Sequence, residues 1–142
     1  MIRARPLIPV FVAVLGTAAA ANGVFMLADP ASRYFAIPGV ITTGPFNQHF
    51  VRDIGLIVLR IGAETVSGAP VPGKRVALWS AAGIWLPGHA ILHLWKVSVG
   101  ICGPDAISRD FPAVTLPALV AITLAVWAWQ DARPGEAGGV FS

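Results

Sequence analysis

Charged side chains are scarce in this chain of 142 residues. They make up 12% of the sequence, whereas apolar residues make up 56%. Soluble globular domains carry about a quarter of their residues as charged side chains. The mean hydropathy of +0.72 points the same way. We therefore expect one all-α integral membrane domain spanning residues 1–142, with no separate soluble domain.

Basic runs and cysteine pairs are also missing. The net charge is +3, but the longest basic run is Lys74-Arg75, without interleaved aromatic residues, so the sequence does not indicate nucleic-acid binding. The single Cys102 excludes an internal disulfide and a Cys-based zinc site, and we interpret it as an inert loop thiol. Phosphate-binding glycine loops and serine nucleophiles beside a base are absent from the sequence too. Catalysis therefore has little support.

Four segments are long enough to cross a bilayer as helices, which takes about 20 residues. They are residues 7–28, 46–68, 76–98 and 111–130. The first also resembles a secretory signal, because the small-residue stretch "TAAAAN" could be cleaved. The apolar run continues through "GVFMLA", however, which favours a retained helix. We predict a bundle of four transmembrane helices.

Basic residues near the predicted spans indicate the orientation. Arg3 and Arg5 precede the first span, and Lys74 and Arg75 lie in the short connection between the second and third. Short loops rich in Lys and Arg stay on the cytoplasmic side. This pattern predicts that both termini are cytoplasmic.

The second predicted span, which opens with "GPFNQHFVRDIG", carries a polar stripe. Four of its polar residues share one face of a helix with about 3.6 residues per turn: His49, Asp53, Arg60 and Glu64. Arg52 lies off this face, close enough to the outer surface to extend its charge into water. Arg60 and Glu64 are one turn apart and can pair. Because lipid cannot solvate such a stripe, we expect it to face the bundle interior or a wet cavity.

The third predicted span carries a second polar pair. In "LPGHAILHLW", His89 and His93 are four residues apart and share one face. If the second and third spans are antiparallel neighbours, His49 lies at the depth of His93, and Asp53 at the depth of His89. Asn22 on the first span lies at a similar depth. The polar residues thus gather in the outer half of the bundle.

These residues predict a metal site near the outer membrane face. Three imidazoles and a carboxylate suit copper, zinc or iron. The predicted ligands are His49, Asp53, His89 and His93. The predicted supporting groups, which would orient ligands or form ion pairs, are Asn22, Arg52, Arg60 and Glu64.

The same residues leave three alternatives open. A b-type haem could be held between two of the histidines, one from each helix. The stripe from His49 and Asp53 to Arg60 and Glu64 could instead conduct protons or a small solute. Finally, the polar side chains could simply hold the helices together through hydrogen bonds.

Three motifs, "DPASRYFAIPGV", "TGPFNQHFVRDIG" and "WLPGHAILHLW", give the chain a resemblance to small bacterial four-helix membrane proteins, loosely similar to the DoxX-like group. The resemblance implies a multi-pass protein of the bacterial inner membrane, and it transfers no site residues. We expect a small membrane subunit or accessory protein. Besides the lipid bilayer, its partners would be other membrane subunits or further copies of itself.

Overall fold

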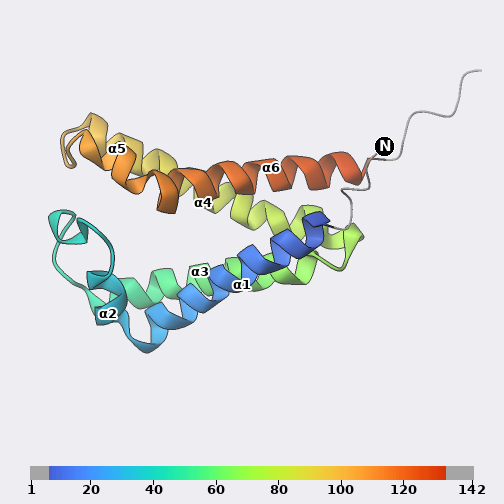
Figure 1. The fold of residues 1–142 in the computed structure, drawn as a ribbon, viewed down its shortest axis with the longest axis horizontal. Helices are drawn as coiled ribbons and strands as arrows, with labels where there is room; N and C mark the ends of the chain where they lie inside the picture. The colour runs from blue at the N-terminus through green and yellow to red at the C-terminus, as the bar shows by residue number, and fades with distance from the viewer. Residues whose placement is uncertain (1–6, 134–142) are drawn as a thin grey trace, which may run out of the picture.

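The computed structural model describes residues 7–133, and within them every regular element is helical (Figure 1). The long helices are α1 (Leu7–Ala28), α3 (Gln48–Gly68), α4 (Arg75–Ser98) and α6 (Leu116–Asp131). The short elements are α2 (Pro30–Phe35), η1 (Val40–Thr42), η2 (Pro72–Lys74), α5 (Asp105–Asp110) and the π-helical η3 (Phe111–Thr115). The all-α class predicted from the sequence is thus confirmed.

Each predicted span overlaps a long helix, and the fourth, 111–130, begins within η3 before α6 starts at Leu116. Two helical segments of the described chain are long and apolar enough to cross a membrane: Leu7–Ala28 and the continuous run Asp105–Asp131. Helices α3 and α4 do not pass the same test, since the polar stripe of α3 and the histidines of α4 lower their hydropathy. Arg3 and Arg5, on which part of the predicted orientation rests, lie outside the described residues.

The long helices form two pairs, α1 with α3 and α4 with α6 (Figure 1). The pairs meet at the end of the molecule where η2 lies, which we call the closed end. They diverge toward the end where α2 and α5 lie, which we call the open end. The molecule is therefore wedge-shaped.

Glycines bring α1 and α3 into close contact. Gly16 and Gly23 on α1 are two helical turns apart, as are Gly55 and Gly62 on α3. A Cβ atom added to Gly23 would lie 2.5 Å from the backbone nitrogen of Leu59. Small residues permit such backbone approach and are enriched where membrane helices pack.

Aromatic and cationic side chains hold the helices together at the closed end. The indole Nε1 of Trp79 donates a hydrogen bond to the carbonyl of Thr65 on α3 at 3.0 Å. The buried Arg75 donates from Nη2 to the carbonyl of Ala69 at 2.8 Å, and its Nη1 lies 3.5 Å from Asp131 Oδ2 on α6. These contacts link α3, α4 and α6 at one end of the wedge.

At the open end, the segment between α1 and α3 folds into α2 and η1. Asp29 begins α2 by accepting a hydrogen bond from the backbone nitrogen of Ser32 at 3.1 Å, and hydrogen bonding with Ser32 lowers the pKa of the Asp29 carboxyl. Farther along, Gly39 has the left-handed φ of +72° and lies against the guanidinium of Arg109 on α5. This loop thus reaches from one helix pair to the other.

Candidate functional site

The most concentrated polar group lies on the α4–α6 pair near the open end. His93 Nδ1 lies 2.9 Å from Asp110 Oδ2, and both side chains are about three-quarters buried. His89, one turn before His93 on α4, places its ring edge-on to the His93 ring at a centroid distance of 4.6 Å. Two imidazoles and one carboxylate therefore lie in contact.

Arg109 fixes the charge and orientation of that carboxylate. Its Nε donates to Asp110 Oδ1 at 3.0 Å, and its Nη1 donates to Asp105 Oδ2 at 3.3 Å. An ionised carboxylate only accepts hydrogen bonds, so the hydrogen between His93 and Asp110 belongs to His93 Nδ1. In neutral His93 the lone pair is then on Nε2. A histidine oriented by a carboxylate in this way is typical of metal ligands.

His49 and Asp53 form a separate pair on α3. His49 Nε2 lies 3.6 Å from Asp53 Oδ2, and the two side chains are 91% and 55% exposed. Within residues 7–133, no group of three or more His, Cys, Asp or Glu side chains is arranged to hold a metal ion. The described chain thus does not bring the four predicted ligands together, and the metal site stays a prediction.

Farther along the stripe, Arg60 is more exposed than we expected, whereas the Glu64 side chain is only 22% exposed. Arg60 Nε donates to Glu64 Oε1 at 2.8 Å, in the pairing that their spacing predicts, but the Arg60 side chain is 77% exposed. The reason lies in the opposite face of α3. Gly62 packs against α1, and at about 100° per residue it lies about 200° from both Arg60 and Glu64. Arg60 consequently points away from α1 instead of into a closed interior, whereas one carboxylate oxygen of Glu64 is buried.

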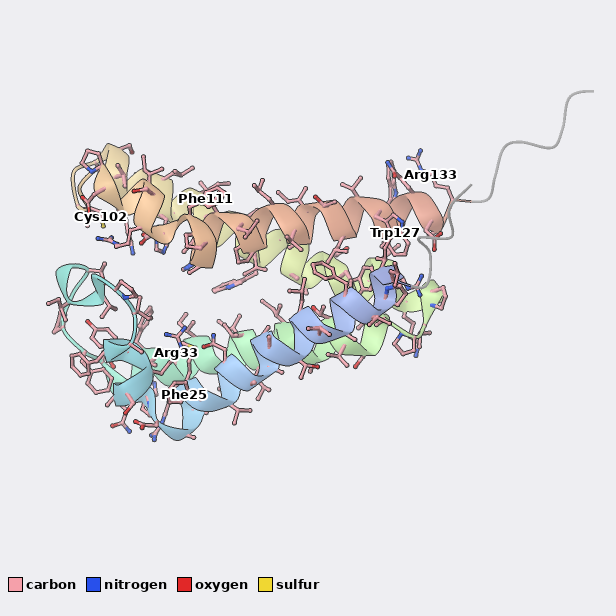
Figure 2. The ribbon with its side chains drawn as sticks, viewed as in Figure 1. Phe25, Arg33, Cys102, Phe111, Trp127 and Arg133 are labelled. Atoms are coloured by element: carbon pink, nitrogen blue, oxygen red, sulfur yellow. The ribbon has the colours of Figure 1, made fainter. Side chains whose placement is uncertain are left out.

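Two of the predicted supporting groups bind elsewhere at the open end. Asn22 Oδ1 accepts a hydrogen bond from Arg33 Nε of α2 at 2.5 Å. Arg52 Nε donates to the carbonyl of Leu27 in the last turn of α1 at 3.1 Å. Both therefore secure α2 and α3 to α1. Figure 2 shows Arg33 on this helix pair and Cys102 on the other, across the open end.

Sequence reasoning did not single out Asp110 or Arg109. Both belong to "ISRDFP", directly before the fourth predicted span. The signal that could have found them is an acid at the start of an apolar helix that directly follows the helix carrying His93. The sequence instead suggested His49 of α3 as the neighbour of His93.

An apolar cavity of about 500 Å³ lies between the two helix pairs. All four long helices contribute to its walls. The lining side chains are mostly aliphatic, with two aromatic residues and one hydroxyl: Phe11, Leu15, Gly16, Ala19, Ile61, Thr65, Trp79, Ala82, Leu86, Pro112, Leu116, Pro117, Val120, Ala121 and Leu124.

The chain matches no protein-family model, no curated protein and no solved structure. The resemblance to DoxX-like proteins accordingly stays a prediction.

Proposed function

We propose that the chain is a small four-helix protein of the bacterial inner membrane, with both termini in the cytoplasm. The support begins with the two apolar segments, Leu7–Ala28 and Asp105–Asp131. Helices α3 and α4 have 21 and 24 residues. At about 1.5 Å per residue each exceeds the roughly 30 Å of a bilayer core.

The surface of the long helices supports the same proposal. Large apolar side chains are exposed on each of them, among them Val14, Leu56, Ile84 and Leu119. In water such a surface would favour aggregation, whereas in a bilayer it contacts lipid.

The proposed activity is binding of a transition-metal ion at the open end. The observation that carries it is the 2.9 Å contact between His93 Nδ1 and Asp110 Oδ2, which leaves His93 Nε2 as a ligand. His89 provides the second imidazole. His49 and Asp53 begin α3 at the same end of the molecule and would complete the set when the helix pairs draw together. Copper, zinc and iron all accept such donors.

Elemental analysis of the detergent-purified protein tests this proposal. We expect one metal ion per chain, and loss of most of it in His89→Ala and His93→Ala. Cys102→Ser is the control, since removal of the only thiol should leave the metal content unchanged. Loss of metal in His49→Ala as well would place ligands on both helix pairs. A protein that binds no copper, zinc or iron after mild purification would refute metal binding.

A structural or assembly subunit is the second candidate. It is favoured by the ion pairs His93–Asp110 and Arg60–Glu64, in which the polar side chains already have partners within the protein. In that case His93→Ala lowers the thermal stability of a metal-free protein. A Soret absorbance band would instead indicate b-type haem. Under either candidate, the partners would be larger membrane assemblies or copies of the same chain.

A further inference from the structure

We propose that the cavity between the helix pairs binds one acyl chain of a membrane phospholipid. Its volume of about 500 Å³ falls within the range of about 300–1,000 Å³ found for small-molecule sites. The cavity is only partly enclosed, so a flexible chain can enter it from the side. This inference rests on the proposed membrane location and uses none of the residues of the proposed metal site.

The chemistry of the walls selects a hydrocarbon. Thr65 is the single hydroxyl in the lining, and it donates its hydrogen bond to the carbonyl of Ile61 at 2.7 Å. The indole nitrogen of Trp79 is likewise engaged, with the carbonyl of Thr65 at 3.0 Å. The lining side chains therefore offer no free donor to a polar ligand. A lining without free polar groups favours an apolar ligand, because a polar one would lose its hydrogen bonds to water.

The wedge shape gives the direction of entry. At the closed end, Val12, Trp79 and Ala128 pack together with at most 2% of each residue exposed. Toward the open end the two helix pairs diverge (Figure 1). A chain that follows the cavity thus points its methyl end at Trp79, and its polar head lies toward the open end.

The lipid bilayer around the protein would supply the acyl chain. Exposed apolar residues such as Phe11 and Leu116 lie both in the cavity wall and on the surface. In a bilayer these surfaces are covered by acyl chains. A chain that fills the cavity also restores van der Waals contacts that the lining side chains lack when it is empty.

Quenching of Trp79 fluorescence by brominated phospholipid tests the proposal. The full-length protein keeps Trp79, and its other four tryptophans are changed to phenylalanine: Trp85, Trp95, Trp127 and Trp129. It is reconstituted into phosphatidylcholine vesicles with or without bromine on the acyl chains, with a chelator present to keep metal away. Although Trp79 is only 2% exposed, we expect strong quenching by the brominated lipid.

Matched substitutions locate the quencher. Ala19→Phe fills the cavity from α1, whereas Ala18→Phe adds the same ring to the exposed neighbour. Because the added ring occupies the cavity, we expect Ala19→Phe to reduce quenching about two-fold or more, and Ala18→Phe to leave it unchanged. Val120→Phe and Leu119→Phe repeat the comparison on α6, in case the first variant does not fold. Equal quenching within both pairs, or an unquenched Trp79, would overturn the proposal.

Discussion

At the scale of single residues, Asp110 has the most consequential position. One of its oxygens faces His93 on α4 and the other accepts a hydrogen bond from Arg109. It thereby orients an imidazole while its own charge is balanced by a guanidinium. This residue decides whether His93 presents a lone pair at Nε2 or a hydrogen.

Replacement of this carboxylate should weaken metal binding. We expect Asp110→Asn to reduce metal affinity by about 10- to 100-fold, the usual effect of removing a group that orients a metal ligand. Isothermal titration of the purified protein with zinc or copper measures it. The matched control is Asp105→Asn, since the Asp105 side chain is 76% exposed and contacts Arg109 without touching His93. If both variants bind as tightly as the parent protein, Asp110 does not support a metal ligand.

At the scale of helices, the tight pairing of α1 with α3 rests on glycine. Gly23 leaves no room for a methyl group above the backbone of Leu59, and Gly16 is similarly close to Val66. Gly88 in α4, by contrast, has no atom within 4 Å of the position that a Cβ would take. The same substitution therefore has opposite consequences in the two helices.

Gly23→Ala should destabilise the protein, whereas Gly88→Ala should not. We expect Gly23→Ala to lower the free energy of unfolding by about 1–3 kcal/mol, because the new methyl group forces the helices apart. Gly88→Ala should leave it unchanged or raise it by up to about 1 kcal/mol, the difference in helix propensity. Denaturation in mixed micelles measures both. A Gly23→Ala protein as stable as Gly88→Ala would show that the helices do not pack this closely.

The helices themselves were predictable from the sequence, but their lateral arrangement was not. Apolar runs and the Pro- and Gly-rich breaks between them fixed where each long helix lies. Which face of α3 meets α1 depends on where backbone can approach backbone, and hydropathy does not report this. The expectation that Arg60 lies in an interior therefore differs from the structure, in which Gly62 occupies the packed face.

At the scale of the whole molecule, the number of membrane crossings distinguishes the proposed four-helix arrangement from one with two. The composition indicates a membrane protein, yet only two segments of the described chain are long and apolar enough to cross a membrane.

The partner of His93 could not be predicted from the sequence, because it depends on how the helices pack side by side. Depth along a helix can be estimated from sequence, whereas the neighbour at that depth depends on how the pairs assemble, and His93 meets Asp110 of its own pair.

Cysteine labelling decides between two and four crossings. Cys102 follows α4, and the exposed Lys74 precedes it. If α4 spans the membrane, a membrane-impermeant maleimide applied to intact cells should label native Cys102. It should not label the Lys74→Cys variant in a Cys102→Ser background. Permeabilised cells provide the control, in which both sites react. Labelling of both sites in intact cells would contradict the proposed topology.

The division into two helix pairs follows the order of the chain. The first pair is complete at Gly68, and the second begins at Arg75 after one short 3₁₀ turn. Because domains form from the N-terminal side during synthesis, α1 and α3 can pair through their glycines before α6 is complete. The contacts between the two helix pairs then form last, once Trp79 of α4 and finally Asp131 of α6 have been synthesised.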